Sequence, residues 1–442
     1  MNKTKETGGF IMSFKVAFIG AGSLVFARTL FTDIMSVPEF HNIEIAFTDI
    51  NEDNLEKTRA LCQRDLDANG IPVKIFATTD RREAFKGARY IVNCVRIGGL
   101  EAFETDIEIP LKYGVDQCVG DTLCTGGIMY GQRVIAEMLN FCKDIREVAE
   151  PGAIMLNYSN PNAMATWACN KYGGVKTIGL CHGEIHGETQ IAEVLGIPRE
   201  ELDIICAGIN HQTWYRKRPE EIKDWINLDN WINGETGGYL RVTREERNWF
   251  ETDYPKILKE EPKKLDGSER GKEHCSYIIE SLETGRVYRG HFNMMNEGCI
   301  TNLPYESVVE VPCYVDGNGI SVPKVGDLPL GCAAVCSQSI WVQKLAVEAA
   351  VHGDVKLLKQ AALMDPLTGA VCNPPEVWQM IDEMLVAQEK WLPQYTEAIK
   401  EAKENLAKGD LIPAKDYHGA ARLREKTPQE VAAEHEARKI TV

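Results

Sequence analysis

Short apolar runs alternate with longer amphipathic segments through the first half of the chain. A helix-like stretch that ends near residue 35 follows the first run, and a charged amphipathic stretch over 54–68 follows the second. Because strands and helices alternate at this spacing, the pattern predicts a parallel sheet with helices on both faces. The predicted strands cover residues 15–19, 43–48, 73–77, 90–95, 153–158 and 177–180.

The second half of the chain has a less regular pattern. A charged segment from 216 to about 270 contains aromatic residues but few strand patterns, whereas 305–314 predicts a strand. Two long helices are expected at 337–363 and 375–402. We expect residues 1–13 to form a disordered extension, and the charged last two dozen residues to form a solvent-facing helix or a frayed tail.

Composition narrows the class of protein. The 442 residues are 44% hydrophobic and 26% charged, as in ordinary globular proteins, and two large α/β domains would fit this length. A formal charge of −16 repels phosphate backbones and anionic lipid, so neither nucleic acid nor a membrane surface is expected as a partner. The sequence contains no run of about 18 apolar residues, so no membrane span is predicted. The 14 cysteines are scattered and no export signal is evident, so we expect a reducing cytoplasm.

A glycine-bearing turn directly follows the first predicted strand. Gly20, Gly22 and Ser23 would let backbone N–H groups approach a pyrophosphate at the N-terminus of the next helix, although Val25 replaces the usual third glycine. Asp49 follows the second strand, where a carboxylate would hold both ribose hydroxyls and favour NAD over NADP. Its distance from the turn exceeds the usual ~20 residues, which a longer first helix would explain. The alternative is an ordinary tight turn with a capping aspartate.

Three polar clusters follow later apolar runs, at the sheet edge where α/β proteins bind ligands. They are Asn-Pro at 160–161, Cys-His at 181–182 and Asn-His at 210–211. A thiolate and an imidazole suit a borderline divalent metal, and two protein ligands would leave positions open for a substrate. Cys181 and His211 are 30 residues apart, so spacing alone leaves open that they are unrelated, or that neighbouring histidines serve instead.

Eight motifs occur in order along the chain: IGAGS (19–23), GGLEAF (98–103), IPLKYG (109–114), GDT (120–122), NYSNP (157–161), CHG (181–183), AGINH (207–211) and NLP (302–304). This ordered set resembles glycoside hydrolase family 4, the NAD- and manganese-dependent glycosidases. The resemblance covers about residues 14–395. It is weakest at about 239–264, the stretch in which the catalytic base of the family lies.

The resemblance implies a lactate/malate-dehydrogenase-like fold, with a Rossmann-type doubly wound parallel sheet plus a second α/β domain. Residues 14–207 would form the NAD-binding domain, and residues 208–442 a C-terminal α/β domain that binds substrate and metal. Because the family generally forms dimers or tetramers, a homodimer or homotetramer is expected.

The resemblance also implies a mechanism that differs from the two-carboxylate scheme of most glycosidases. Enzyme-held NAD⁺ takes a hydride from sugar C3, and the resulting ketone acidifies the C2 proton. A base removes that proton while manganese polarises the C3 oxygen. The glycosidic oxygen then leaves by elimination, water adds across the double bond, and the nicotinamide returns the hydride. NAD is therefore recycled.

Several site residues carry over motif by motif. Cys181 and His211 match the ligands of manganese, or of another divalent metal. Asn160 matches an asparagine that contacts sugar hydroxyls, and Asn302 is expected to bind substrate as well. The residues that match the dinucleotide site are Gly20, Gly22, Ser23 and Asp49.

The acid and the base are less clearly marked by the motifs. His182 is a candidate leaving-group acid or a substrate-binding residue, and Asp121 is a second acid candidate or a helix cap. Tyr254 is the favoured base, although tyrosine needs a nearby metal or cation for this role and the residue could simply pack. The competitors of Tyr254 are Tyr239, Glu251 and Asp253.

The resemblance indicates a small sugar substrate without phosphate, because Cys-His marks members that act on unphosphorylated α-glycosides. Gly183 resembles α-glucosidase and uronidase members, whereas the GDT and NLP motifs look like those of galactosidases. We therefore predict an α-galactosidase, with an α-galacturonidase, α-glucuronidase or α-glucosidase as alternatives. The arginines that would bind a uronate carboxylate, or else lie on a solvated face, are Arg241, Arg244 and Arg247.

An NAD-dependent hydroxyacid or polyol dehydrogenase is the alternative from a different class of enzyme. It would use a His–Asp pair with a substrate-binding arginine, would need no cysteine ligand, and would accumulate NADH. A third alternative, an inactive NAD-sensing protein, is disfavoured because the metal and sugar motifs are intact. Fold alone does not separate these three, since function belongs to the site.

Overall fold

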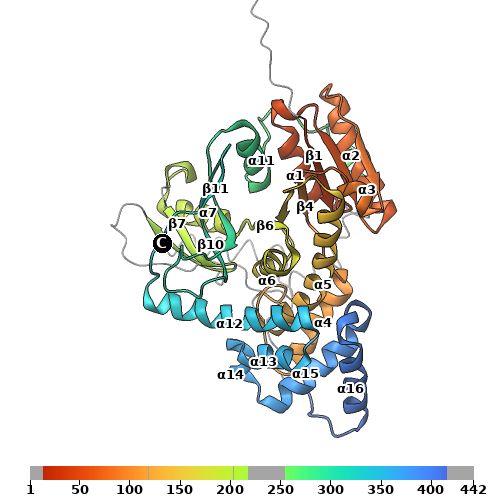
Figure 1. Ribbon diagram of the computed structural model, residues 1–442, viewed down its shortest axis with the longest axis vertical. Coiled ribbons are helices and arrows are strands. Elements are labelled where there is room, and N and C mark those ends of the chain that lie inside the picture. The colour runs from red at the N-terminus through yellow and green to blue at the C-terminus, as the bar shows by residue number, and fades with distance from the viewer. Residues whose placement is uncertain (1–12, 118, 203, 218–253, 416–442) are drawn as a thin grey trace, which may run out of the picture.

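The computed structural model describes residues 13–117, 119–202, 204–217 and 254–415 (Figure 1). Its strands form one eleven-stranded sheet in the order β3-β2-β1-β4-β5-β6-β9-β10-β7-β8, with β11 paired to β10. The pairs from β3 to β6 are parallel and the later pairs are antiparallel. The parallel half has the predicted Rossmann-type order.

Each predicted strand in the parallel half is present within a few residues of its expected position. These strands are β1 (Lys15–Ile19), β2 (Glu44–Thr48), β3 (Ile75–Thr78), β4 (Tyr90–Asn93), β5 (Ile154–Asn157) and β6 (Lys176–Gly179). The antiparallel strands are β7 (Ile204–Ile209), β8 (Gln212–Lys217), β9 (Tyr288–Met295), β10 (Val308–Asp316) and β11 (Gly319–Ser321). The predicted domain boundary between residues 207 and 208 falls inside β7, and the division into domains stays a prediction.

Helices cover the sheet, and the C-terminal helices gather beside α5 at one end of the molecule (Figure 1). The helices before β7 are α1 (Phe26–Met35), α2 (Glu52–Ala68), α3 (Arg81–Phe85), α4 (Gly99–Lys112), α5 (Cys124–Val148), α6 (Asn162–Ala168) and α7 (Gly183–Leu195). The later helices are α10 (Tyr254–Ile257), α11 (His274–Thr284), α12 (Leu330–His352), α13 (Val355–Met364), α14 (Pro366–Val371), α15 (Pro374–Ala387) and α16 (Thr396–Ala407).

Three expectations about helices were wrong, each for a local reason. The predicted helix 337–363 is two helices, because Gly353 adopts a left-handed conformation (φ 64°) and Asp354 caps the next one. The predicted helix 375–402 breaks after α15 into two 3₁₀ turns, the second of which begins at Pro393. The first helix is not long: α1 has ten residues, and a 3₁₀ turn at Pro38–Phe40 adds to the spacing before Asp49.

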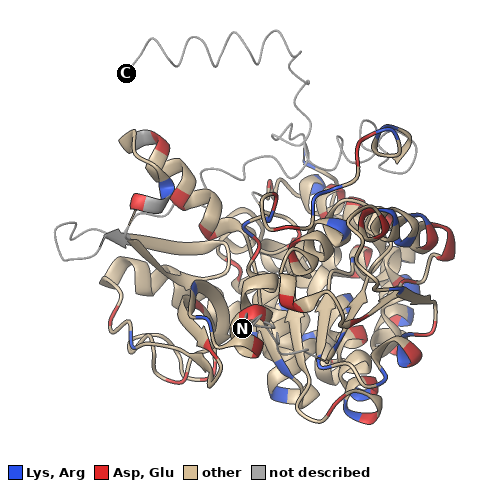
Figure 2. Cartoon of the chain, turned by 90° about the horizontal axis from the view of Figure 1, so that it is seen from above, with Lys and Arg blue, Asp and Glu red and all other residues tan. Residues whose placement is uncertain are grey.

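Charged residues of both signs are interspersed over the helices and loops (Figure 2). In the part of the chain that the structure describes, no helix combines the length and apolar character that crossing a membrane requires. The described residues include only the last residue of the expected extension at 1–13. The expected C-terminal helix or tail also lies outside the described residues.

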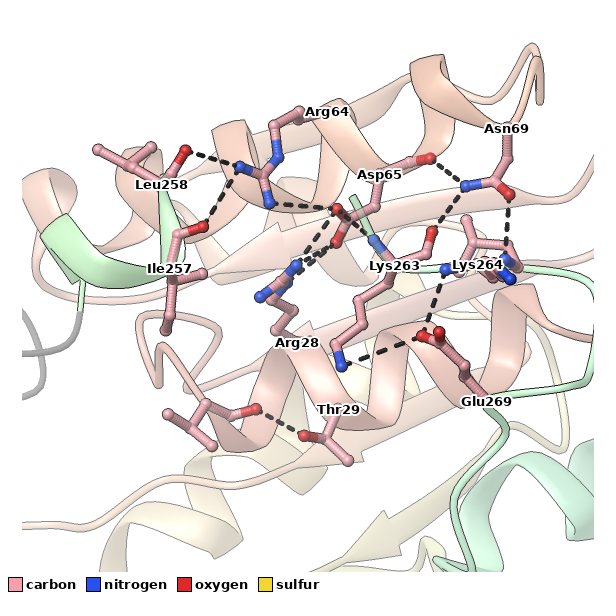
Figure 3. Close-up of polar contacts among 12 residues, drawn as sticks. Arg28, Thr29, Arg64, Asp65, Asn69, Ile257, Leu258, Lys263, Lys264 and Glu269 are labelled. Carbon is pink, nitrogen blue, oxygen red and sulfur yellow. Dashed lines mark hydrogen bonds and ion pairs between the residues drawn. The ribbon is translucent and has the colours of Figure 1, made fainter. Parts of the chain in front are cut away.

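A fully buried aspartate joins α2 to the segment that follows α10 (Figure 3). Asp65 forms a salt bridge with Arg28 of α1 at 2.8 Å, and its carboxylate also accepts the backbone N–H of Lys263. One turn later, Asn69 donates to the carbonyl oxygen of Lys263 and accepts the N–H of Leu265. The segment is thus held to the Rossmann half through its backbone, independently of its side chains.

We predict that Asp65→Ala lowers the free energy of unfolding by about 3–5 kcal/mol, because it leaves the Arg28 guanidinium buried without its counter-charge. Chemical denaturation of both proteins measures the change. Asp67→Ala, on the same helix but at an exposed position where the carboxylate is paired with Lys74 and Gln63, is the matched control and should change little. Equal losses in the two variants would contradict the role given to Asp65.

Candidate active site

A cavity of about 1940 Å³ lies along the carboxyl ends of the parallel strands. This is the edge of an α/β sheet at which ligands bind. The cavity brings together most of the residues singled out in the sequence. Those that line it are Gly20, Gly22, Ser23, Asp49, Asp121, Asn160, His182 and His211.

The glycine turn forms one end of the cavity. Gly20 has φ 83°, and a Cβ atom there would lie 2.8 Å from the carbonyl carbon of Cys94, so only glycine fits. The N–H of Gly22 donates to Asp49 Oδ2 at 2.8 Å, and that of Asn51 donates to Oδ1 at 2.9 Å. The third glycine of the usual motif allows the helix to pack closely on the strand. Val25, which stands in its place, precedes α1 and is 37% exposed, so no close packing requires a glycine there. The turn therefore leaves backbone exposed beside a fixed carboxylate.

The two predicted metal ligands meet just beyond the carboxyl end of β6. Cys181 follows β6, His211 follows β7, and the distance from Sγ to Nε2 is 3.7 Å. The N–H of Gly183, at the start of α7, points to the sulfur at 3.4 Å and stabilises negative charge on it. His211 is held at φ 61°, a conformation that non-glycine residues keep only where the surroundings impose it.

This pair fits a divalent metal. In tetrahedral zinc sites, for comparison, a sulfur ligand at about 2.3 Å and a nitrogen ligand at about 2.0–2.1 Å from the ion are separated by about 3.6 Å. The observed 3.7 Å between Sγ and Nε2 matches that separation. The donor set of one thiolate and one imidazole suits a borderline divalent ion.

Asp121 lies between a cation and a substrate-binding candidate. Arg96 donates to Asp121 Oδ2 at 3.1 Å, and Asn160 Nδ2 lies 3.5 Å from the same oxygen. Burial opposes ionisation of this carboxyl, but the charges of Arg96 and His211 and a hydrogen bond from Thr122 outweigh it and lower its pKa. An ionised Asp121 suits hydrogen-bond acceptance or base chemistry better than proton donation.

His182 lies at the start of α7 and faces a carboxylate that the sequence did not single out. Its Nδ1 is 3.6 Å from Oε1 of Glu273, just before α11. Removal from water and the nearby histidines His186, His211 and His274 lower the pKa of His182 to about 4. Burial raises the pKa of Glu273. A neutral imidazole beside a carboxyl that holds its proton more tightly suits substrate binding or proton relay.

Two further candidates lie elsewhere. Tyr254 is not among the residues that line the cavity, and its ring lies 5.9 Å from Nζ of Lys57 on α2. Asn302 is also outside the lining, and its amide bonds both the N–H and the carbonyl oxygen of Leu328. Their proposed roles stay predictions. The other candidates, which lie outside the described residues, are Tyr239, Arg241, Arg244, Arg247, Glu251 and Asp253.

Comparison with known proteins identifies the family. The model of the family 4 glycosyl hydrolases matches residues 15–197, and that of their C-terminal domain matches residues 217–368. An α-galactosidase of Rhizobium meliloti is 52% identical over 97% of this chain and 99% of its own length. An α-galactosidase of Bacillus subtilis is 31% identical over 86% of this chain and 99% of its own. The chain therefore belongs to the family 4 glycosyl hydrolases.

Solved structures agree with the fold. A 6-phospho-α-glucosidase from gut microorganisms, crystallised with NAD and glucose-6-phosphate, superposes with a TM-score of 0.74 at 22% identity, covering 86% of this chain and 99% of its own. The 6-phospho-β-glucosidase of Thermotoga maritima, crystallised with manganese, NAD⁺ and glucose-6-phosphate, gives a TM-score of 0.70 at 23% identity, with coverage of 86% and 99%. The predicted fold class and family are confirmed.

The loop before Glu273 rests on a buried carboxyl of α1. Asp33 accepts the N–H of Gly271 at 2.6 Å, and burial raises the pKa of Asp33 to about 6. A carboxyl whose pKa is higher in the folded state contributes stability that is complete below the unfolded pKa and is lost as pH rises through the folded value. Asp33 should therefore weaken the fold between pH about 4 and pH about 7.

We predict that Asp33→Asn, which stays neutral, is more stable than wild type by about 2–3 kcal/mol at pH about 8 but not at pH about 4. Denaturant unfolding across this pH range measures the difference. Asp53→Asn, at an exposed position on α2 where the carboxylate is paired with Lys57, is the control and should not become more stable than wild type as the pH rises. A constant difference for Asp33→Asn would show that folding does not change the pKa of Asp33.

Proposed function

We propose that this protein hydrolyses α-galactosides with bound NAD and a divalent metal, manganese by preference. One observation carries the proposal: a single cavity joins the glycine turn and Asp49 to His211, whose imidazole lies 3.7 Å from the Cys181 sulfur. The similarity to two α-galactosidases supports the choice of sugar.

In this proposal, bound NAD supplies a reversible hydride acceptor for a sugar carbon, and the metal supplies a Lewis acid for the neighbouring oxygen. Cys181 and His211 hold the metal, while the glycine turn and Asp49 hold the dinucleotide. Asn160 orients sugar hydroxyls against Asp121, which Arg96 keeps anionic. Hydride leaves the sugar and returns to it, so the net reaction is addition of water across the glycosidic bond.

Two proton transfers remain for side chains of this protein. The C2 proton needs a base, for which Tyr254 is the motif-based candidate and Asp121 the ionised carboxylate within the cavity. The leaving oxygen needs a proton, which the His182–Glu273 pair could deliver because Glu273 has a raised pKa and faces the imidazole.

The charges around the cavity favour a neutral sugar. Each described lysine or arginine that lines it is paired with a carboxylate, so none is left to meet a phosphate or a uronate. The pairs are Arg81 with Glu137 and Asp144, Arg82 with Asp144 and Glu147, Arg96 with Asp121, Arg133 with Asp106, and Lys390 with Glu101. Among the residues that the structure describes, a phosphorylated or uronic substrate would reach a cation of the cavity only by competing with one of these pairs.

We also propose a homo-oligomer that works in the cytoplasm. The helix α12 carries no charged residue from 330 to 343, and Leu330, Val335 and Trp341 are exposed on it. An exposed apolar helix face is typical of a subunit interface. The described cysteines are all free thiols, which agrees with a reducing compartment.

We predict that nitrophenol release from an α-galactoside requires NAD⁺, Mn²⁺ and a thiol reductant together. In D₂O the released galactose should carry deuterium at C2, because that proton is removed and replaced. Nitrophenyl α-galacturonide, α-glucuronide and α-glucoside, tested in parallel, should react more slowly. Faster release from one of the two uronides would indicate that the substrate is an α-uronide and not an α-galactoside.

Two outcomes of the same assay would contradict the mechanism. Hydrolysis that continues after bound NAD is removed would point to ordinary acid–base hydrolysis. Steady NADH accumulation without nitrophenol release would instead support the dehydrogenase alternative.

The carboxylate of Asp49 offers a separate test of the cofactor. We predict that Asp49→Ala weakens NAD⁺ binding about 10- to 100-fold, the ordinary cost of losing hydrogen bonds to a charged group. Calorimetric titration of the protein with NAD⁺ measures this directly. Asp53→Ala is the matched control, because Asp53 lies four residues later, in the first turn of α2, and its carboxylate is paired with Lys57. Unchanged affinity in Asp49→Ala would remove this residue from the cofactor site.

A further inference from the structure

A buried acidic side chain lies three residues after the candidate ligand Cys181. Glu184 is in the first turn of α7 and is only 2% exposed. Its Oε1 is 2.9 Å from Nε2 of His274, and its Oε2 is 3.4 Å from Nδ1 of His291. The Glu184 cluster, defined as Glu184, His274 and His291, therefore joins α7 to the start of α11 and to β9.

The cluster reaches the other metal ligand through the backbone. Nε2 of His291 accepts the N–H of Cys206 at 3.1 Å, and Cys206 lies on β7, the strand that leads to His211. On the opposite side, Nδ1 of His274 is bonded to the hydroxyl of Tyr288 at 2.7 Å. Glu184 is thus linked both to Cys181, through the start of α7, and to His211, through β7.

The residue types of this cluster, with Glu188 one turn later on α7, could themselves suggest a second metal site. The hydrogen bonds oppose that assignment. Because Nε2 of His291 accepts an N–H, its lone pair is there, and the neutral ring must carry its proton on Nδ1. A protonated Nδ1, which lies 3.4 Å from Oε2 of Glu184, has no lone pair for a metal. Glu188 is already paired with Arg199 at 2.6 Å.

The histidines explain how a charge is kept at this depth. Burial opposes ionisation of Glu184, yet His291 and His274 outweigh it and hold the pKa of Glu184 well below its usual range. A buried carboxylate with partners on separate segments contributes little net stability but fixes the relative position of those segments.

We propose that Glu184 is the positioning residue of the metal site, setting the start of α7, and with it Cys181, at the distance from His211 that a metal requires. The inference rests on the metal site of the proposed function. Glu184 would act through the segments that carry the ligands, and groups that orient metal ligands commonly change metal affinity when they are replaced.

Cobalt binding tests the proposal apart from catalysis. The chelator-treated full-length protein is titrated with Co²⁺ in the presence of NAD⁺, and the thiolate-to-cobalt absorption band reports the geometry at Cys181. We expect one bound Co²⁺ per chain in wild type. Glu184→Gln should weaken the affinity about tenfold or more and alter the band, as outer-shell changes do.

Glu188→Gln is the matched control, since Glu188 is on the same helix, is buried and is also ion-paired. It should lower thermal stability but leave the band and the Co²⁺ affinity within about twofold of wild type. If Glu184→Gln does not fold, Glu184→Asp keeps the charge but withdraws it by one methylene, and should weaken binding to a smaller extent.

Each remaining outcome has a distinct meaning. Folded Glu184→Gln with the wild-type band and affinity would overturn the positioning role. A second bound Co²⁺ that is lost in both Glu184→Gln and Glu188→Gln would show that the cluster is itself a metal site, and would overturn it as well. A wild-type protein that binds Co²⁺ without a thiolate band would instead overturn the metal site of the proposed function.

Discussion

The site depends on holding Cys181 and His211 close enough together to bind one metal ion, although the strands that precede them, β6 and β7, are not neighbours in the sheet. β9 and β10 lie between β6 and β7, so three strand spacings of about 4.8 Å would separate the two strands by about 14 Å in a flat sheet. The sheet can change direction at two junctions, each of a single residue pair, Gly179 with Asn293 and Gly208 with Glu310. At the first junction a Cβ on Gly179 would lie 2.7 Å from the Cβ of Asn293, so glycine permits the close approach of β6 to β9.

The dinucleotide turn and the candidate metal ligand His211 line one cavity. The parallel strands all deliver their carboxyl ends to the same edge, so the turn after β1 and the Asn-Pro motif after β5 face each other across it. The Arg96–Asp121 pair lies in the cavity between them. Because the cations here are already neutralised, hydroxyl groups are better partners than anions for the polar groups that remain.

The sequence predicted the parallel half closely because its strands are continuous apolar runs buried on both faces. Local signals were enough for the glycine turn and for the residues after each strand. The helix break at Gly353 was missed because the apolar pattern continues through it. Glu273 was missed for a different reason: it meets His182 only when α11 packs near α7, and no spacing in the chain marks that contact. Glu184 similarly looks like a solvated residue of an ordinary first turn.

The segment from α10 to α11 shows why such contacts matter. At one end its backbone is bonded to Asp65 and Asn69 of α2, and at the other His274 faces Glu184 of α7. Both carboxylates are buried, and burying a charge brings little net stability even when it is paired. What each carboxylate provides is a unique position for the segment, which carries Tyr254 at its start and Glu273 near its end. Two buried acids from the first half of the chain thus determine where the second half presents its chemistry.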